Sequence, residues 1–277
     1  MKVIGIETSG NIGGVAVCQD KRIVTAKNFG DMQHGKELIP AIKGIFHEIG
    51  WEPKDIDLIA VDVGPGSYTG LRVGVTCAKT LAYVLNKPVI DVPVFDIIAE
   101  NYNPIPPPIS PPSQGGNNEK IYPKNFRPSS PQDKGEAKDP LHKNGLLSEY
   151  YICPVFDARR NHVYACIYKL AINYHEQELE GIWQKRVSEF LVIQPEKLVS
   201  ILPRPVIIFG DGVPPYKKIF HQKDIFIDKE EHATPTAEHV ALLGEGMFES
   251  GHRCDIDKLL PLYLRQAEAI EKREGKK

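Results

Sequence analysis

The residues of this sequence best suited to hold a phosphate lie in a glycine-rich turn. Residues 64–74 read Gly-Pro-Gly-Ser-Tyr-Thr-Gly-Leu-Arg-Val-Gly and follow a short, apolar, β-branched stretch. Glycine tolerates positive φ angles and lets a ligand approach the backbone closely, and a turn that opens a helix directs free N–H groups outward. Ser67 or Thr69 can cap the helix that follows. A phosphate or the surface of another protein could therefore lie against this turn.

Two further turns, 8–14 and 210–212, also place glycines after an apolar stretch. In actin-like and sugar-kinase-like folds, paired glycine turns from two lobes hold a nucleotide. A kinase-like or ATP-hydrolysing enzyme would also need Glu7 or Asp62 beside the nucleotide and its magnesium. A bare glycine turn is more often only a tight connection that binds nothing, and no P-loop lysine pattern is present. The candidate nucleotide-facing residues are Thr8, Ser9, Gly64, Gly66, Ser67 and Thr69.

Metal-dependent and nucleophilic chemistry find little support in the residue spacing. None of the nine histidines is followed by another four residues later, and no HExxH motif or carboxylate–histidine cluster is present. Ser67 and Thr69 lie in no GxSxG motif. His34 precedes a predicted helix, where a polar residue more often has a structural role. We therefore predict no catalytic residue and no metal ligand in this chain.

The first hundred residues contain the elements that would position these turns. Short strand-like runs at 3–6, 13–18 and 22–26 predict two hairpins. A helix is predicted from about 38 to 49, where apolar residues recur at helical spacing, and a second from 71 to 85. Buried strands at 56–63 and 88–92 complete a β-β-β-α-β-α-β order, typical of a ribonuclease-H-like sheet. A Rossmann sheet would instead carry its glycine motif after the first strand.

The rest of the chain is predicted to form an insertion, a second lobe and a C-terminal part. We assign 1–102 to the N-terminal lobe. Residues 103–147 are rich in proline, glycine and serine and cannot build a core, which indicates a flexible insertion. A smaller β-rich lobe is predicted at 148–232, beginning with two strands around a polar turn, and 233–277 is predicted to form helices that pack back on the lobes. Pro235 is expected at the first helical position.

Overall composition narrows the class of protein. A formal charge of −2 and a pI near 6.5 argue against binding nucleic acid through the overall field, although a local basic patch stays open. The five scattered cysteines show no CxxC pair and are typical of reduced core thiols. The N-terminus begins directly with a strand and no run is long enough to span a membrane, so we expect a cytoplasmic protein without membrane attachment.

The helix predicted at 71–85 is apolar or small on two sides. One side carries Leu71, Val75 and Ala78, and the other carries Val73, Cys77 and Val84. A helix that packs only on its own sheet needs a single apolar stripe, so the second side calls for another partner. Part of that partner could be the helix at 38–49. Periodicity alone is equally consistent with a fully buried crossover helix.

The ordered set of motifs resembles the bacterial TsaB (YeaZ) family. The turn at 64–74 carries most of the resemblance, supported by Ile-Gly-Ile-Glu-Thr-Ser at 4–9, by His34 with Leu38 and Pro40, and by the runs 156–164 and 261–265. The match spans both lobes, and only the proline-rich insertion is foreign to it. Any one of these pieces is moderately specific, whereas the ordered combination is highly specific.

The resemblance implies a two-lobed, actin-like ATPase (ASKHA) fold and a role in making threonylcarbamoyladenosine on tRNAs that read codons beginning with adenine. TsaB proteins are accessory subunits of the transferase TsaD. TsaD carries an HxxxH metal pair at the positions that Val94 and Ile98 occupy here. Neither side chain can bind a metal. The resemblance therefore implies a chain without catalytic activity or cofactor of its own, with ATP as a ligand of the complex.

The resemblance also implies partners. The N-terminal lobe is expected to pair with that of TsaD through a helical bundle, with the ATPase TsaE near the junction and tRNA contacted only within the complex. Without TsaD, the same surface is expected to form homodimers. The interface residues we predict are Leu38, Ile42, Ile45, Leu71, Val75 and Ala78. Two alternatives stay open, a nucleotide-binding enzyme of the kinase or ATPase type and a homologue of M22-type metalloproteases.

Overall fold

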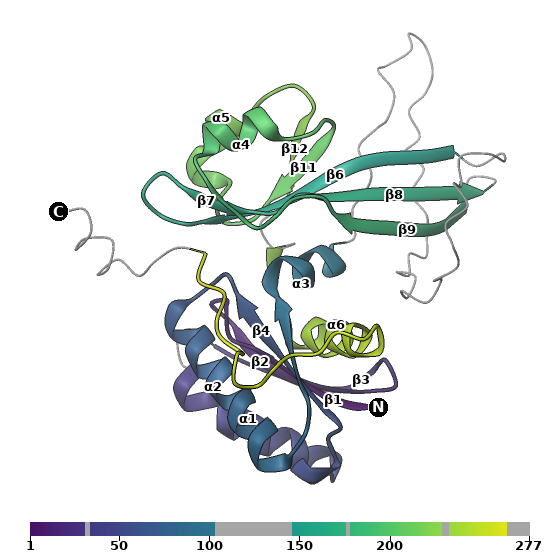
Figure 1. Cartoon of the computed structure of the whole chain (residues 1–277). Coiled ribbons are helices and arrows are strands. Elements are labelled where there is room, and N and C mark those ends of the chain that lie inside the picture. Colours follow the sequence, from purple (N-terminus) through teal and green to yellow (C-terminus); the bar gives the residue numbers. More distant parts are fainter. Residues whose placement is uncertain (31–33, 103–145, 176–177, 229–232, 265–277) are drawn as a thin grey trace. The chain divides into compact units, whose positions relative to one another are not determined.

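The computed structural model describes residues 1–30, 34–102, 146–175, 178–228 and 233–264 (Figure 1). Two compact units are present: an N-terminal unit of Met1–Asn101 with Glu231–Lys277, and a second unit of Tyr102–Glu230. The predicted insertion at 103–147 lies outside the described residues, apart from its last two positions. None of the described helices is both long and apolar enough to cross a membrane.

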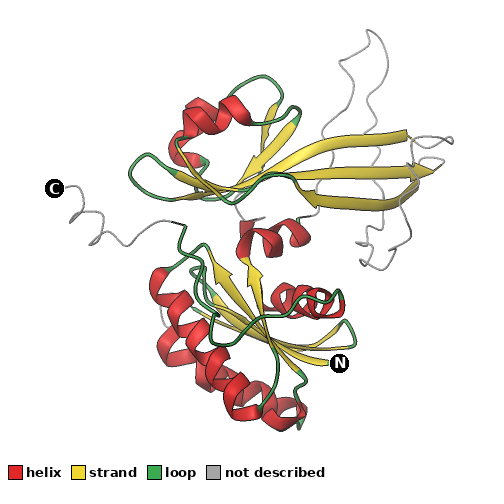
Figure 2. Cartoon of the chain, viewed as in Figure 1, coloured by secondary structure: helices red, strands yellow, loops and turns green. Residues whose placement is uncertain are grey.

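The N-terminal unit is a five-stranded mixed sheet covered by helices on both faces (Figures 1 and 2). Its elements are β1 (Lys2–Glu7), β2 (Gly13–Gln19), β3 (Arg22–Phe29), α1 (His34–Ile49), a 3-10 turn (Pro53–Asp55), β4 (Leu58–Gly64), α2 (Tyr68–Leu85), β5 (Val89–Pro93), α3 (Val94–Asn101) and α6 (Ala237–Glu249). The strand order is β3-β2-β1-β4-β5, with β1, β2 and β3 antiparallel and β4 and β5 parallel to β1. The predicted ribonuclease-H-like arrangement is confirmed.

Side chains along each strand alternate between the two faces of this sheet, and each face has its own hydrophobic core. Ile4 and Ile6 of β1 pack with α1 and α2, whereas Val3 of β1 packs with α6 on the opposite face. Successive side chains of a strand point to opposite faces, so a strand that is apolar throughout needs cover on both sides. The C-terminal helix α6 supplies that second cover. Residues 233–264 thus complete the N-terminal unit, with α6 as the helix of this described stretch and Thr236 rather than Pro235 at its start.

The close approach of α6 to β1 depends on Gly5. A Cβ at this position would lie 2.4 Å from the Ala237 carbonyl oxygen and 2.6 Å from the Ala241 nitrogen, both backbone atoms. We expect Gly5→Ala to push α6 off the sheet and to lower the free energy of unfolding by about 1–3 kcal/mol, measured by urea denaturation. Gly246→Ala, on α6 with nothing within 4 Å of the added Cβ, is the control and should be neutral or stabilising. Equal stability of Gly5→Ala and the unmodified protein would contradict this packing.

The second unit is a seven-stranded mixed sheet with two short helices. Its elements are β6 (Leu146–Asp157), β7 (Val163–Ala165), β8 (Tyr168–His175), β9 (Glu178–Arg186), β10 (Leu191–Ile193), α4 (Pro195–Ile201), β11 (Val206–Phe209), a 3-10 turn (Pro214–Tyr216), α5 (Lys217–Phe220) and β12 (Ile225–Ile227). Strands run in the order β10-β7-β6-β11-β12, with β8 pairing β6 and β9 pairing β8. This part of the chain is rich in strands, and the predicted polar turn is followed by two strands, β7 and β8, rather than one.

Candidate functional site

The two N-terminal glycine turns predicted to face a nucleotide come together and fill each other's space. The Ser67 N–H donates to the Ser9 carbonyl oxygen at 2.8 Å. A Cβ at Gly66 would lie 2.5 Å from the Ser9 Cβ, and one at Gly74 would lie 2.2 Å from the Thr8 Oγ1. Glycine is needed at both positions because protein, rather than a ligand, approaches the backbone there.

Ser67 sets the start of α2. Its Oγ accepts a hydrogen bond from the Gly70 N–H at 3.2 Å, the N-cap interaction that the sequence predicted for Ser67 or Thr69. Thr8, Ser9 and Gly64 are buried, whereas Gly66, Ser67 and Thr69 are exposed. The turn therefore anchors α2 to the sheet and leaves its outer edge at the surface.

Beneath these turns, Glu7 and Asp62 form a buried carboxyl pair. Glu7 ends β1 and Asp62 lies near the end of β4, and the parallel register that matches Ile6 with Val61 brings the two side chains to the same edge of the sheet. Glu7 is 1% exposed and Asp62 is 0% exposed. The two carboxyl groups are near enough for the charge of Asp62 to act on Glu7.

Each carboxyl group uses one oxygen for the neighbouring backbone. Glu7 Oε1 accepts from the Ser9 N–H and Oγ–H, both at 2.6 Å, and from the Gly10 N–H at 3.0 Å. Asp62 Oδ1 accepts from the Gly64 N–H at 2.6 Å. The other two oxygens, Glu7 Oε2 and Asp62 Oδ2, are buried and have no hydrogen-bond partner among the described residues.

Burial raises the pKa of both acids. Desolvation and the nearby charge of Asp62 raise the pKa of Glu7 to about 8, against the opposing hydrogen bonds from Ser9 and Gly10. Desolvation raises the pKa of Asp62 to about 6, with Ser9, Gly64 and Glu7 opposing the shift through hydrogen bonds. Glu7 has the higher pKa of the two because the negative charge of Asp62 disfavours its ionisation.

This pair predicts that stability falls as pH rises. In the unfolded chain Glu7 loses its proton near pH 4.5, whereas in the folded chain it keeps the proton up to about pH 8. Between these two pH values unfolding therefore releases a proton, and the free energy of unfolding falls as pH rises. Glu7→Gln mimics the protonated acid, because its side chain is neutral and its carbonyl can still accept from Ser9. We expect Glu7→Gln to lose most of this pH dependence in urea unfolding. Glu48→Gln, on the exposed side of α1, is the control. An unchanged pH profile in Glu7→Gln would contradict the raised pKa of Glu7.

The six side chains predicted at the partner interface are buried within the N-terminal unit. They are Leu38, Ile42 and Ile45 of α1 and Leu71, Val75 and Ala78 of α2, each 5% exposed or less. The prediction is corrected on this point, because these residues face their own sheet. Small residues at four-residue spacing, Gly70, Gly74, Ala78 and Ala82, bring this side of α2 against the strands.

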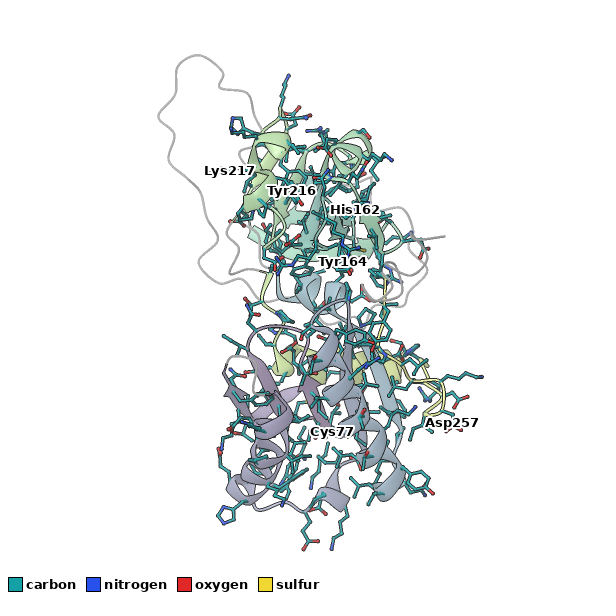
Figure 3. All side chains as sticks on the ribbon, turned by 90° about the vertical axis from the view of Figure 1, so that its left-hand side faces the viewer. Cys77, His162, Tyr164, Tyr216, Lys217 and Asp257 are labelled. Atoms are coloured by element: carbon teal, nitrogen blue, oxygen red, sulfur yellow. The ribbon has the colours of Figure 1, made fainter. Side chains whose placement is uncertain are left out.

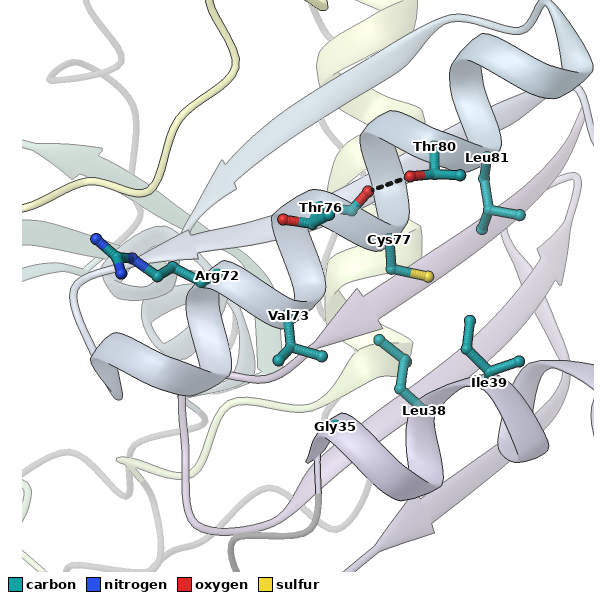
Figure 4. A pocket seen from close by; sticks show the side chains of 9 residues that line it. All are labelled: Gly35, Leu38, Ile39, Arg72, Val73, Thr76, Cys77, Thr80 and Leu81. Carbon is teal, nitrogen blue, oxygen red and sulfur yellow. Dashed lines mark hydrogen bonds between the residues drawn. The ribbon is translucent and has the colours of Figure 1, made fainter.

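The opposite side of α2 is the exposed one. We call Arg72, Thr76, Thr80, Tyr83 and Val84 the α2 ridge; all five are exposed, with Tyr83 81% and Val84 72% accessible. A groove of about 480 Å³ runs between this ridge and α1. Figure 4 shows Val73, Cys77 and Leu81 of α2 on the side that faces Leu38 and Ile39 of α1. Leu38 is therefore the one predicted interface residue that also lines the groove.

The C-terminal segment, residues 252–264, borders α2 on the other side. Lys79 Nζ donates to the carbonyl oxygens of Asp257 at 3.4 Å and Leu259 at 3.3 Å, and the Leu262 N–H donates to Val63 at 2.7 Å. Leu259 is buried in the same core as α1 and α2, whereas Asp257 is exposed (Figure 3). Sequence reasoning expected 233–277 to form helices that pack back on the lobes but did not predict these contacts with α2, because the segment has no helical or strand periodicity.

The described residues offer no metal centre. No group of three His, Cys, Asp or Glu side chains within residues 1–30, 34–102, 146–175, 178–228 and 233–264 is placed to hold an ion. Val94 and Ile98 are both buried in α3. Cys18, Cys77, Cys153 and Cys166 are buried free thiols, and burial is the main cause that raises the pKa of Cys77 to about 11.

Known proteins resemble this chain along its whole length. It is 27% identical to the tRNA threonylcarbamoyladenosine biosynthesis protein TsaB of Bacillus subtilis (strain 168), over 98% of this chain and 97% of that protein. The TsaB protein of Escherichia coli (strain K12) is 23% identical over the full length of both chains. Residues 29–131 match the model of a family described as TsaD, tRNA N6-adenosine threonylcarbamoyltransferase.

Solved structures support the same fold. YeaZ from Pseudomonas aeruginosa superposes with a TM-score of 0.64 at 19% identity, covering 95% of this chain and 99% of that one. A second structure, described as an uncharacterized protein with similarity to peptidase YEAZ from Pseudomonas aeruginosa, gives 0.65 at 20% identity with the same coverage. Together with the ordered motifs and the two-unit fold, these matches make the chain similar over its whole length to the TsaB and YeaZ proteins.

Proposed function

We propose that this protein acts in the biosynthesis of threonylcarbamoyladenosine on tRNA, as a non-catalytic subunit that pairs with the TsaD transferase through the α2 ridge and the groove beside it. The names of the full-length relatives support the pathway. The observation that carries the mode of action is the exposed side of α2 beside the apolar groove, because a ridge that leaves the large side chains of Tyr83 and Val84 so accessible is typical of a protein interface.

The geometry suits a helical partner. Two neighbouring helices with an apolar groove between them offer side chains at helical spacing, and a helix from another subunit can lay its own apolar side into such a groove. Pairing two helices from each subunit would produce the bundle expected from the family. The same surface would hold a second copy of this chain when TsaD is absent. Docking of TsaE near the junction, with ATP and tRNA bound by the whole complex, completes the proposal.

A nucleotide-binding enzyme of the kinase or ATPase type has weaker support. It needs accessible carboxylates for a magnesium ion, whereas Glu7 and Asp62 are buried beneath turns that pack on each other. Heat release on titration with ATP and magnesium would revive this alternative. A metalloprotease of the M22 type would need ligands that the described residues do not gather.

Light scattering after size exclusion tests the proposed pairing. The chain alone should elute as a dimer, and addition of TsaD should convert it into a complex with one copy of each chain. A chain that stays monomeric and never co-elutes with TsaD would refute the proposal. If the chain elutes as a dimer and added TsaD does not dissociate that dimer, the ridge serves only self-association, and the proposed pairing with TsaD is refuted as well.

A further inference from the structure

At the N-terminal end of the α2 ridge, three side chains form what we call the arginine cluster: Tyr68, Arg72 and Tyr263. Arg72 Nε donates to the Tyr263 hydroxyl at 3.0 Å, and Nη2 donates to the Tyr68 hydroxyl. The guanidinium lies 4.0 Å from the centroid of the Tyr68 ring, and the two tyrosine rings are 5.0 Å apart. All three residues are exposed, so the arginine is held in place at the surface rather than covered.

Within the part of the chain that the structure describes, the positive charge of this cluster has no counter-ion. Among the residues that the structure describes, no carboxylate forms an ion pair with Arg72, although exposed pairs such as Lys21 with Glu249 form elsewhere in the unit. The first turn of α2 contains no acidic residue either. A helix N-terminus carries a partial positive charge, so the guanidinium and the helix dipole add at this end of the ridge.

Anchoring of the C-terminal segment does not explain the cluster. That segment is already tied to the unit by Lys79, by the hydrogen bond between Leu262 and Val63, and by burial of Leu259. The hydroxyls of Tyr68 and Tyr263 are neutral hydrogen-bond partners, so they do not neutralise the charge of Arg72 as a carboxylate would. Two rings that hold a planar guanidinium in one orientation reduce the entropy lost when it binds a carboxylate.

We propose that the arginine cluster recognises a carboxylate on the protein that docks on the α2 ridge. This inference rests on the proposed function and adds a chemical requirement to it. The docking surface of the partner must be apolar opposite the groove and must carry an Asp or Glu opposite the N-terminal end of α2. Arginine binds a carboxylate through two parallel hydrogen bonds, which fixes the orientation of the partner along the ridge. A charge at the rim of an interface also speeds association.

Binding kinetics of Arg72→Gln with immobilised TsaD, at low and at high salt, test this requirement. The variant should bind about tenfold more weakly at low salt, the effect of losing one charge-assisted hydrogen-bond pair, with most of its salt dependence gone. Arg72→Lys should keep the salt dependence but bind more weakly, because lysine lacks the planar fork. Arg22→Gln, which removes an equal charge from exposed β3, should match the unmodified protein.

Thermal unfolding separates recognition from a structural role. If Arg72 only holds the C-terminal segment, Arg72→Gln will lower the melting temperature while affinity and salt dependence match those of Arg22→Gln, and the proposal is wrong. Thr80→Glu, also on the ridge, distinguishes failure of the carboxylate requirement from failure of the proposed pairing with TsaD. Pairing lost in Thr80→Glu but normal in Arg72→Gln overturns the carboxylate requirement alone. Normal pairing in both variants overturns the proposed function.

Discussion

Thr80→Glu is expected to abolish pairing with TsaD while leaving the fold intact. Thr80 is exposed on the α2 ridge and lines the groove, so a carboxylate there costs the isolated chain little. In a complex, the same carboxylate would be buried opposite an apolar helix without a partner, and the dissociation constant should rise about 100-fold or more. Titration calorimetry with TsaD measures the loss.

Ser200→Glu is the matched control for this variant. Ser200 is an exposed hydroxyl residue on α4 of the second unit, and its Oγ donates to the Lys197 carbonyl at 2.7 Å, as the Thr80 Oγ1 donates to the Thr76 carbonyl at 2.8 Å. Both substitutions remove one hydrogen bond from a hydroxyl to a backbone carbonyl of the same helix, and both add one negative charge. Only Thr80→Glu should affect pairing, and equal affinities for the two variants would show that the α2 ridge is not the interface.

Val75→Glu, in contrast, is expected to unfold the N-terminal unit. Val75 is 3% exposed and belongs to the core that α1 and α2 form over the sheet. An unpaired carboxylate in that core should cost about 4 kcal/mol or more, a large part of the stability of a domain of this size. Circular dichroism and urea denaturation measure the effect.

Val75→Thr separates the charge from the loss of packing. Threonine has the shape of valine with one buried hydroxyl, and it should cost about 1–3 kcal/mol and leave a folded protein. A folded Val75→Glu variant that fails to bind TsaD would mean that Val75 faces the partner, as the sequence alone suggested. Loss of binding together with loss of helical signal is the result that the structure predicts.

The sequence predicted the elements of the N-terminal unit well because their signals are local. Alternation, helical spacing and the caps around Ser67 are properties of neighbouring residues. The face of α2 that meets the sheet is not local, since both of its sides are apolar. The signal lay in Gly70, Gly74, Ala78 and Ala82, whose lack of bulk allows the helix to lie close to the sheet, as where Gly74 meets the Thr8 side chain.

The carboxyl pair was within reach of the same reasoning. Glu7 and Asp62 were considered as separate candidates, but parallel pairing of β1 with β4 places the ends of both strands side by side. No sequence pattern predicts that the two glycine turns pack on each other and bury both carboxyl groups. The C-terminal segment shows the same limit, because its contacts with α2 come from residues about 180 positions away, such as Lys79 with Leu259.

Reconstitution of the tRNA modification tests the central claim most directly. Purified TsaD, TsaE, tRNA and the small substrates would be combined with no further protein, with this chain, or with its Thr80→Glu or Ser200→Glu variant, and the modified adenosine would be measured by mass spectrometry of digested tRNA. We predict threonylcarbamoyladenosine only with the unmodified chain and with Ser200→Glu. Equal yields without this chain, or with Thr80→Glu, would contradict the claim that it acts by presenting the α2 ridge to TsaD.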